Sequence, residues 1–312
     1  MELQQIIIAC CTAWGAVFFL QYVLLVASSL FAFLIRPGKN LKKAGDWGIV
    51  TGATDGIGQA IAFELAKKGL HIILLSRTEA KLAATAKEIS AKYPNIQVEY
   101  VAIDFSNFDS VAQGKVSDVI KSKDIAVLVN NVGMSYPFAK YYDELKLEEV
   151  DAMTELNVNS TSRMTYLVLP NMLSRKRGFV INMSSGSAWN ACPLLSQYAA
   201  TKSYVEQFTA SMHQEYKKKG VHFQVQSPLF VSTKLAKIRN SSLTVPSPKQ
   251  FAQSSVAHIG YEMSVSPYWA HALQLHVMSK LPSFLLNNVV MSMHMAIRKK
   301  GRAKEEKAGK AN

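Results

Sequence analysis

The sequence predicts an α/β fold built on a doubly wound parallel sheet. Short apolar runs alternate with longer helical patterns between Asp46 and Pro228. β-branched residues and leucines occupy both the odd and the even positions of these runs, which is typical of strands covered on both faces. Alternation of strands and helices at these spacings indicates parallel strands joined by helical crossovers.

Six strands are expected in this region. They are predicted at residues 47–52, 71–76, 98–104, 125–131, 179–184 and 223–228, with helices opening near Gly58, Thr78, Asn107, Leu147 and Gln197. Residues 234–260 are richer in Ser, Pro and Lys and are interpreted as a mobile insertion. A chain of 312 residues can bury one full-sized core without splitting into two domains.

An apolar segment precedes this region. Thirty residues from Ile6 to Ile35 carry no charge, and about 20 apolar residues suffice to cross a bilayer core of about 30 Å. A signal peptide would have a basic start and a shorter apolar run, whereas the only charged side chain before this segment is Glu2. We therefore expect an uncleaved transmembrane anchor.

The charges after the anchor predict its orientation. Four basic residues follow at once, namely Arg36, Lys39, Lys42 and Lys43. Positive flanks stay on the cytosolic side, so the body of the protein should face the cytosol. That body contains a single cysteine, Cys192, which cannot form a disulfide framework and agrees with a reducing compartment.

The C-terminus combines a second apolar stretch with a basic tail. Residues 281–297 are largely apolar but contain Asn287, Asn288 and His294, and seven Lys or Arg against two Glu follow them. This pattern favours an interfacial or re-entrant helix whose tail lies near anionic headgroups. A full span and a core helix with a solvated tail are the alternatives. The net charge of +13 does not indicate nucleic acid, because no base-reading motif accompanies it.

A glycine-rich turn follows the first predicted strand. Ligands of an open α/β sheet bind outside the carboxyl ends of its strands, and here the sequence reads TGATDGIG. Glycines let backbone N–H groups approach a pyrophosphate at the N-terminus of the next helix. The spacing is not the common GxGxxG, and a plain tight turn is the alternative. The candidate cofactor residues are Gly52, Thr54, Asp55, Gly56, Ile57 and Gly58.

The next strand ends extend this candidate cofactor site. The second strand ends in Ser76-Arg77, which offers a guanidinium for a 2′-phosphate where an NAD enzyme would have a carboxylate, so we expect NADPH. An exposed surface arginine is the alternative. Asp104, after the third strand, is placed to accept from the adenine amino group. Asn131 and Gly133, after the fourth, would pin the strand end and admit the cofactor.

Tyr198 and Lys202 form a pair in the segment QYAATKSYVEQF. If this segment is helical, their spacing of four places them on one face. A phenol with a pKa of about 10 beside a cation is a candidate acid, although this spacing alone is weak evidence.

Several motifs together resemble the short-chain dehydrogenase/reductase family. TGATDGIG is similar to the family's TGxxxGxG turn, NNVG to its NNAG, and Tyr198-x-x-x-Lys202 to its active-site pair. Ser185 precedes Tyr198 by thirteen residues, as the family's serine does, with Ser184 as a neighbouring rival, and Asn157 matches the helix asparagine. The resemblance covers about residues 46–234 and implies a Rossmann-like fold.

The resemblance also implies roles in the reduction of a carbonyl. Tyr198 would donate the proton, and Lys202 would lower the pKa of the phenol and hold the nicotinamide ribose. Ser185 would stabilise the developing oxyanion, and Asn157 would hold a water that links Lys202 to solvent. After the last strand, Leu229 replaces the family's glycine, while Val231 and Thr233 are expected cofactor contacts.

The loop PLFVSTKLAKIR and the two apolar ends resemble one branch of the family, the membrane-anchored very-long-chain 3-oxoacyl-CoA reductases. This implies NADPH-dependent reduction of 3-oxoacyl-CoA to 3-hydroxyacyl-CoA in fatty-acid elongation at the endoplasmic reticulum. The implied partners are the bilayer, the elongase, the dehydratase, the enoyl reductase and a second copy of the chain. The alternatives are a steroid, sterol or retinoid oxidoreductase and a non-catalytic membrane scaffold.

Three regions follow from these expectations. Residues 1–44 form a membrane anchor with its basic flank, residues 45–234 an NADP-binding catalytic domain, and residues 235–312 the substrate-side insertion, the apolar segment and the tail. We expect Lys234, Lys237 and Arg239 to attract the phosphates of acyl-CoA, with a merely solvated basic face as the alternative. The seven histidines lack ligand spacing, so we expect no metal.

Overall fold

The computed structural model describes residues 2–309. The chain separates into two compact units, which divide between Gly38 and Lys39. In the first unit, α1 (Glu2–Leu30) continues through a π-helical turn (Phe31–Ile35). It is the one helix within residues 2–309 whose length and composition suit a membrane span. α10 (Ser283–Gly309) does not meet the same criteria of length and composition.

The second unit is organised around a seven-stranded parallel sheet with strand order β3-β2-β1-β4-β5-β6-β7. The strands are β1 (Trp47–Thr51), β2 (His71–Ser76), β3 (Val98–Ala102), β4 (Ile125–Asn130), β5 (Gly178–Met183), β6 (Val221–Gln226) and β7 (Ser264–Val265). The strand order reverses between β1 and β4, which is where an open sheet of this kind binds its ligand. The doubly wound prediction is confirmed, and only the two-residue β7 was not expected.

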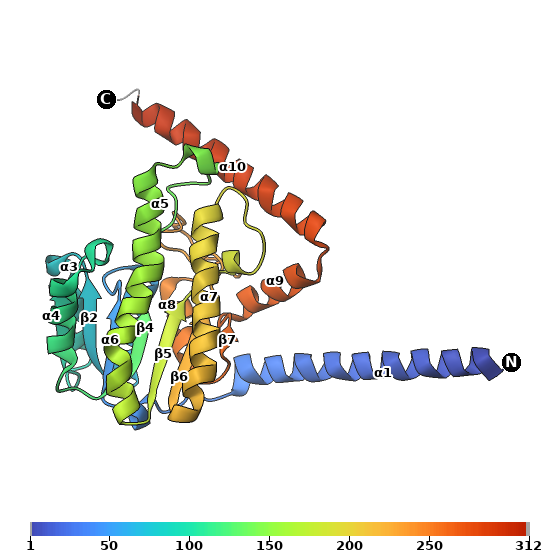
Figure 1. Cartoon of the computed structure of the whole chain (residues 1–312), viewed down its shortest axis with the longest axis horizontal. Helices are drawn as coiled ribbons and strands as arrows, with labels where there is room; N and C mark the ends of the chain where they lie inside the picture. Colours follow the sequence, from blue (N-terminus) through green and yellow to red (C-terminus); the bar gives the residue numbers. More distant parts are fainter. Residues whose placement is uncertain (1, 310–312) are drawn as a thin grey trace. The chain divides into compact units, whose positions relative to one another are not determined.

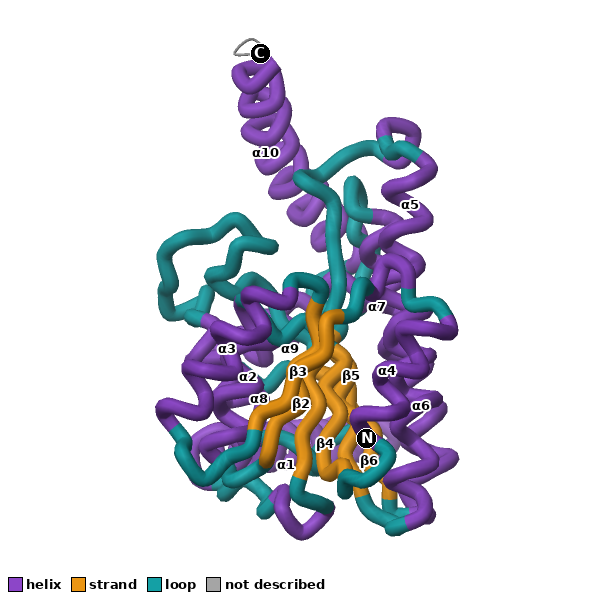
Figure 2. Tube along the Cα trace, turned by 90° about the vertical axis from the view of Figure 1, so that its left-hand side faces the viewer, coloured by secondary structure: helices purple, strands orange, loops and turns teal. Residues whose placement is uncertain are grey.

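Helices cover both faces of the sheet (Figure 2). One face carries α2 (Gly56–Lys67), α3 (Glu79–Lys92) and α8 (Pro248–Ala257), and the other carries α4 (Ser110–Ile120), α6 (Ser160–Ser174) and α7 (Ser196–Tyr216). The central strands are buried on both faces, as Ile49 and Val50 of β1 illustrate. Burial of each such side chain stabilises the fold by about 1.5–3 kcal/mol.

The segment expected to be a mobile insertion contains a packed helix. Ser247 caps the N-terminus of α8: its side chain accepts from Gln250 N while the Gln250 side chain accepts from Ser247 N. Pro248 occupies the first turn, where its missing N–H costs nothing. Phe251 and Val256 are buried against α2 and the sheet. The interpretation of residues 234–260 as wholly mobile is therefore wrong.

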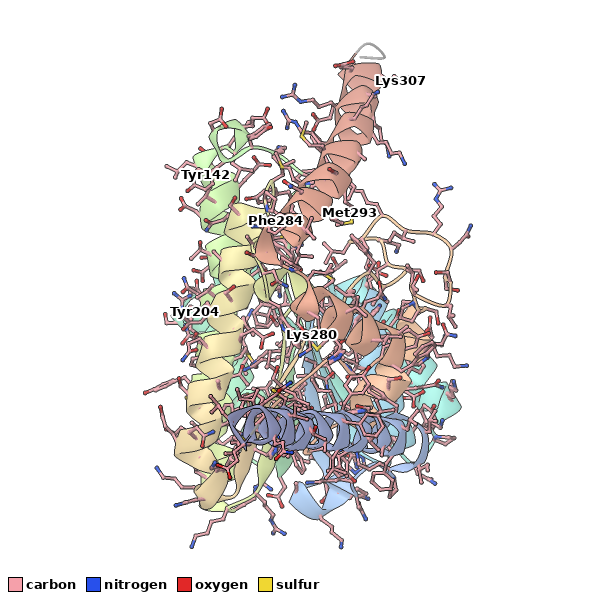
Figure 3. The ribbon with its side chains drawn as sticks, turned by 90° about the vertical axis from the view of Figure 1, so that its right-hand side faces the viewer. Tyr142, Tyr204, Lys280, Phe284, Met293 and Lys307 are labelled. Carbon is pink, nitrogen blue, oxygen red and sulfur yellow. The ribbon has the colours of Figure 1, made fainter. Side chains whose placement is uncertain are left out.

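α5 (Leu147–Thr154) runs through a π-helical turn (Glu155–Asn159) into α6 without a break. The chain ends in α9 (Trp269–Lys280) and α10 (Ser283–Gly309) (Figure 1). α10 buries one side chain on each of four successive turns: Leu286, Val290, His294 and Arg298. Its other faces expose Phe284 and Met293, and Lys307 lies near its end (Figure 3).

Candidate active site

Thr51 joins the ends of β1 and β4 at the carboxyl edge of the sheet. Its hydroxyl accepts hydrogen bonds from the backbone N–H groups of Asn131 (2.9 Å) and Val132 (3.0 Å). The Asn131 amide donates back to the Thr51 carbonyl at 3.0 Å. Asn131 therefore fixes the strand ends in the way expected of it. Thr51 was quoted in the motif, but the sequence did not identify it as the centre of this network.

The glycine turn after β1 leaves its backbone open. Gly52 and Gly56 have φ angles of +64° and +56°, which other residues rarely adopt. A Cβ at Gly58 would lie 2.3 Å from the Gly52 carbonyl oxygen and 2.4 Å from Asn131 Nδ2, so no side chain fits there. The N-terminus of α2 is therefore accessible to an anion such as a pyrophosphate.

The polar side chains of this turn bind the protein itself. The Asp55 carboxylate caps α2 by accepting from Gly56 N at 2.8 Å and pairs with Lys234 at 2.7 Å. The Thr54 hydroxyl lies 2.9 Å from that of Ser76 at the end of β2. Ile57 packs against the core. Thr54, Asp55 and Ile57 thus shape the turn, while the glycines leave the space.

The ends of β2 and β3 bring a cation and a carboxylate together. Asp104 accepts from the N–H and the hydroxyl of Ser106, at 3.0 and 2.6 Å. These bonds, and secondarily the charge of Arg77, hold the pKa of Asp104 below its ordinary value. Arg77 itself is exposed. Both predicted residues therefore lie at the same edge of the cofactor site.

Tyr198 and Lys202 lie one turn apart near the start of α7. The ammonium of Lys202 is 5.9 Å from the centre of the Tyr198 ring and donates to the Met183 carbonyl at 2.9 Å. Lys202 is buried, and burial lowers its pKa to about 8. At neutral pH it is a cation with little margin against deprotonation.

The pKa of Tyr198 differs from the expectation that Lys202 would lower it. Burial raises the pKa of the phenol, the hydrogen bond with Ser185 lowers it, and the nearby Cys192 raises it slightly. The reason is that low-polarity surroundings disfavour both phenolate and ammonium, and the ammonium is engaged by a backbone carbonyl. The structure thus favours a protonated phenol at neutral pH.

The two adjacent serines have different partners. Ser185 accepts from Ser187 N at 3.2 Å and lies close enough to Tyr198 to lower the pKa of its phenol. The Ser184 hydroxyl is buried and donates to the carbonyl of Lys202 at 3.0 Å. The geometry therefore places Ser185 beside the phenol, while Ser184 attaches α7 to the sheet.

Asn157 lies in the π-helical turn between α5 and α6. Its carbonyl oxygen accepts from Met134 N at 2.8 Å, and its amide donates to Met134 O (3.0 Å) and the Thr201 hydroxyl (2.9 Å). A Cβ at Gly133 would lie 2.9 Å from Asn157 Oδ1 and 3.4 Å from Lys202 Nζ. Gly133 therefore keeps open the space that both side chains border.

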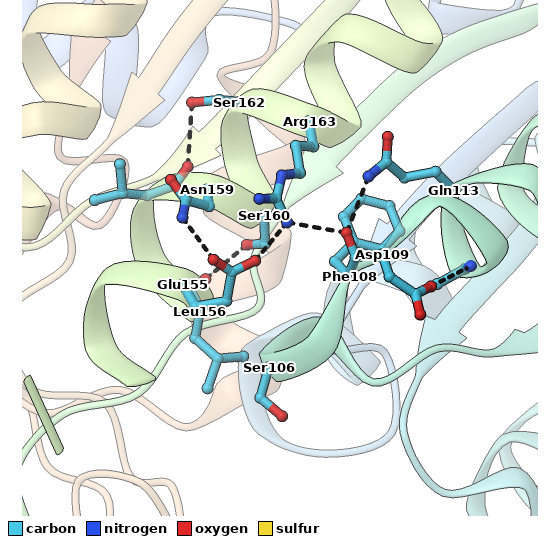
Figure 4. A network of polar contacts seen from close by, with 12 residues as sticks. Ser106, Phe108, Asp109, Gln113, Glu155, Leu156, Asn159, Ser160, Ser162 and Arg163 are labelled. Atoms are coloured by element: carbon cyan, nitrogen blue, oxygen red, sulfur yellow. Dashed lines mark hydrogen bonds and ion pairs between the residues drawn. The ribbon is translucent and has the colours of Figure 1, made fainter. Parts of the chain in front are cut away.

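An ion pair braces this π-helical turn from outside. Arg163 of α6 pairs with Glu155 at 2.6 Å and donates to the Phe108 carbonyl at 2.9 Å (Figure 4). Asn159 donates to the same carboxylate at 2.5 Å. The turn is thus attached to the segment before α4, which fixes the backbone position of Asn157.

The segment after β6 closes on the glycine turn. Val231 is buried, and a Cβ at Gly56 would lie 3.3 Å from Thr233 Cγ2. Leu229 stands where the family has glycine, and its side chain packs against Gly186. A Cβ added at Gly186 would lie 2.4 Å from Leu229 Cδ2.

His271 of α9 holds this segment in place, and no sequence motif pointed to this residue. It is fully buried; its Nδ1 accepts from Leu229 N at 3.3 Å, and its Nε2 lies 3.1 Å from the Phe230 carbonyl. Burial lowers the pKa of His271. A neutral ring with one N–H satisfies both contacts.

α10 packs on the segments that flank Tyr198. Glu144, in the segment between β4 and α5, forms ion pairs with Arg298 and Arg302. The hydrogen bond from Arg298 is the largest cause that lowers the pKa of Glu144, to about 2. His294 Nδ1 lies 2.6 Å from the Pro193 carbonyl, in the loop between β5 and α7. The C-terminal helix is thus attached to the two segments that precede α5 and α7.

Comparisons with known proteins agree with this arrangement. Residues 47–243 match the family model of short chain dehydrogenases. The chain is 41% identical over 256 residues to the very-long-chain 3-oxoacyl-CoA reductase of Homo sapiens, covering 81% of each chain. Two solved structures have a similar fold: a 7beta-hydroxysteroid dehydrogenase (TM-score 0.72, 22% identity, 81% of this chain and 99% of the other) and a short-chain dehydrogenase from Sphingobium yanoikuyae in complex with NADPH (TM-score 0.64, 21% identity, 76% and 96%).

The family match covers the whole sheet except β7 and includes every strand end described above. The motifs, the topology and the matched residues lead to one conclusion: this chain belongs to the short-chain dehydrogenase family.

Proposed function

We propose that the protein reduces the 3-oxo group of a very-long-chain 3-oxoacyl-CoA to a 3-hydroxyl group with NADPH. The observation that carries the proposal is a half-buried Tyr198 with the Lys202 ammonium 5.9 Å from the centre of its ring and Ser185 beside it. Burial raises the pKa of the phenol, so it is protonated at neutral pH. Lys202 lies one turn away beside Gly133, and the glycine turn after β1 packs against Asn131 and Val132 at the same strand end. The substrate class is supported by the similarity to the human reductase over most of both chains.

The residues of the site fit NADPH. A dinucleotide needs a close approach to the backbone, and the crowding at Gly58 leaves the turn without side chains. Arg77 would bind the 2′-phosphate. The carboxylate of Asp104, at the neighbouring strand end, already accepts two hydrogen bonds from Ser106. When bound, NADPH supplies a hydride to C3 of the substrate.

The side chains of the site would stabilise and protonate the oxygen of the 3-oxo group. Ser185 would donate a hydrogen bond to the carbonyl oxygen and stabilise its developing charge. The Tyr198 hydroxyl would transfer its proton to the same oxygen, which yields the 3-hydroxyl group. Lys202 would hold the ribose hydroxyls and restore the proton, with Asn157 keeping a solvent path beside Gly133. Val231 and Thr233 would close on the nicotinamide end.

The membrane is the proposed location of this reaction. α1 is long and apolar enough to cross a bilayer, and its basic flank would keep the catalytic body at the cytosolic face of the endoplasmic reticulum. Very long acyl chains partition into the bilayer at about 0.8 kcal/mol per buried CH₂. An anchored reductase would therefore meet its substrate, and the elongase, dehydratase and enoyl reductase of the same cycle, at one surface.

α9 and α10 carry a second surface that supports a bilayer contact. On α9, Trp269, Leu273 and Val277 are exposed at intervals of four residues, and on α10 Phe284 and Val289 are exposed. Exposed apolar patches of this kind are unusual on soluble domains. Replacement of Leu273 and Val277 by Glu should reduce flotation of the body, residues 39–312, with anionic vesicles. Unchanged flotation would contradict this part of the proposal.

The long helices on the α7 face support a homodimer. Tyr166 of α6 and Tyr204 of α7 are exposed, and the Tyr204 ring stacks on Phe208 with centroids 5.8 Å apart. Tyrosine is enriched at protein interfaces. Sedimentation of the solubilised protein should give twice the chain mass, and Tyr166→Glu should shift it to the monomer. A wild-type monomer would contradict the pairing.

The test of the function is NADPH consumption by the purified full-length protein with 3-oxoacyl-CoA substrates of increasing length. A steroid ketone serves as the competing substrate. We expect turnover that favours long acyl chains, and a loss of about 10²–10⁴-fold in Tyr198→Phe. Turnover of the steroid alone, or full activity of Tyr198→Phe, would contradict the proposal.

A further inference from the structure

A basic cavity of about 900 Å³ lies next to the cofactor turn and is not used by the proposed chemistry. It lies between α2, α3, the segment after β6 and the start of α8, with one residue from α10. Six cations line it: Lys92, Lys234, Lys237, Arg239, Lys249 and Lys304. Its volume is that of a site for a nucleotide-sized ligand.

The cavity has a surplus of positive charge. Three carboxylates face the six cations: Asp55, Glu64 and Glu88. Asp55 pairs with Lys234, and Glu64 lies 3.9 Å from Lys67 on its own helix. Among residues 2–309, Arg239, Lys249 and Lys304 form no ion pair in the structure, although all three are exposed at the cavity. Three cations from three segments thus converge there, with Glu88 as the remaining carboxylate of the lining.

Two aromatic rings line the same cavity. Phe63 of α2 and Tyr93 at the end of α3 are half-buried, and the Lys92 ammonium lies 5.6 Å from the centre of each ring. Aromatic rings beside cations suit a ligand that has both a base and phosphates, because the base stacks while the phosphates accept charge-assisted hydrogen bonds. This combination favours a phosphorylated nucleotide over inorganic phosphate.

The cavity adjoins the reaction site. Gly56 of the cofactor turn and Thr233 line it. Lys237 lines it too, and its ammonium donates at 2.6 Å to the carbonyl of Pro137, in the segment that follows Gly133. The segment 233–237 therefore separates the cavity from the catalytic cluster. A ligand with a phosphorylated nucleotide on a long flexible arm can place its other end at Tyr198.

We propose that this cavity binds the 3′-phosphoadenosine diphosphate end of the acyl-CoA. The inference rests on the proposed function for its substrate class and assigns a place to the part of that substrate that does not react. Arg239, Lys249 and Lys304 bind the phosphates, and Phe63 with Tyr93 receives the adenine. The phosphopantetheine arm passes over residues 233–237 to the catalytic cluster.

The test compares two triple variants of the full-length protein in detergent. The first combines Arg239→Glu, Lys249→Glu and Lys304→Glu. The matched control combines Lys115→Glu, Lys121→Glu and Lys218→Glu, which changes the net charge equally at exposed sites on α4, directly after α4 and just after α7. CoA and NADPH binding are measured by calorimetry, and KM is measured for a 3-oxoacyl-CoA and for the N-acetylcysteamine thioester with the same acyl chain.

We expect the cavity variant to weaken CoA binding and raise KM for the acyl-CoA by at least about tenfold. Its KM for the truncated thioester and its NADPH affinity should stay within about twofold of wild type, which also shows that the variant is folded. The control should resemble wild type in every measurement.

Three results would overturn the cavity assignment: equal losses with both thioesters, a loss of NADPH rather than CoA binding, or CoA binding equal to wild type. The loss of NADPH binding would mean that the cavity serves the cofactor's 2′-phosphate. If wild type bound CoA through these cations yet did not reduce 3-oxoacyl-CoA, the proposed function would fail while the cavity assignment stood.

Discussion

The ammonium of Lys202 donates a hydrogen bond of 2.9 Å to the carbonyl oxygen of Met183, the last residue of β5. This bond joins the helix that carries Tyr198 to the carboxyl edge of the sheet. Because the same ammonium is buried, its pKa falls to about 8. Lys202 is therefore both an attachment point and a group that titrates close to neutral pH.

The rate of reduction should fall as the pH rises through about 8, because deprotonated Lys202 can no longer restore the proton of Tyr198. The measurement is the pH profile of kcat/KM. The Lys202→Met variant should lose about 10²–10⁴-fold in kcat and show no inflection near this pH. A wild-type profile that stays flat up to pH 10 would contradict this role.

The titration of Lys202 should also affect the free energy of unfolding, which should rise with pH where the rate of reduction falls. Between pH values of about 8 and 10.5 the unfolded chain binds the Lys202 proton and the folded chain does not. The contribution of Lys202 to the free energy of unfolding therefore rises with pH across this window and is constant below it. Denaturant unfolding of wild type should show this rise, and Lys202→Met should lack it.

The two adjacent serines should separate chemistry from stability. Ser185→Ala removes the donor beside Tyr198 and should lower kcat by about 10²–10³-fold with little change in unfolding. Ser184→Ala removes the bond to the Lys202 carbonyl and should destabilise the fold by about 1 kcal/mol while kcat changes little. If Ser184→Ala caused the larger loss of kcat, the assignment of the two serines would be reversed.

Gly58 and Gly114 offer a matched pair of helical glycines. A Cβ at Gly58 meets backbone at 2.3 Å, so Gly58→Ala should destabilise the fold by about 1–3 kcal/mol and weaken NADPH binding. At Gly114, in the middle of α4, a Cβ has no neighbour within 4 Å. Gly114→Ala should stabilise by about 0.5–1 kcal/mol. Thermal unfolding and NADPH titration measure both, and tolerance of Gly58→Ala would exclude the tight turn.

Glu144 should control how firmly α10 is held. Glu144→Gln leaves the buried Arg298 without its anion, so the amides of residues 294–302 should exchange hydrogen faster. Glu148→Gln, an exposed glutamate on α5, is the control and should change nothing. In wild type the stabilisation from this ion pair is fully present above a pH of about 4.5 and is lost as the pH falls through about 2. Equal rates of amide hydrogen exchange in the two variants would show that the Glu144–Arg298 ion pair does not hold α10 in place.

The six long strands of the sheet were predictable because each has a recognisable pattern within its own few residues. Runs such as HIILLS are apolar on both parities, and the observed β2 has the predicted bounds. Two residues are too few for a period, so β7 left no signal. α8 was missed because its segment is polar in composition, although Ser247 and Pro248 carry a capping signal that could have revealed it.

The candidate site was predictable in its residue types but not in its energetics. Motif spacing brought Ser185, Tyr198 and Lys202 together, yet the raised pKa of Tyr198 depends on burial by several elements. The contact between Glu144 and Arg298 spans 154 positions, and His271 reaches Leu229 across 42. No local pattern encodes such contacts, because packing between distant segments creates them.

The π-helical turn at Glu155–Asn159 has a consequence for engineering of this protein. A turn of this type holds one residue more than the α-helical period, and each residue of an α-helix advances by about 100°. Removal of a single residue there would restore the plain α-helical period, so α6 would keep its packing against the sheet while the Asn157 amide would lose its contacts with Met134. Insertions and deletions in a redesigned sequence should therefore avoid Glu155–Asn159, even though α5 and α6 together look like one uninterrupted helix.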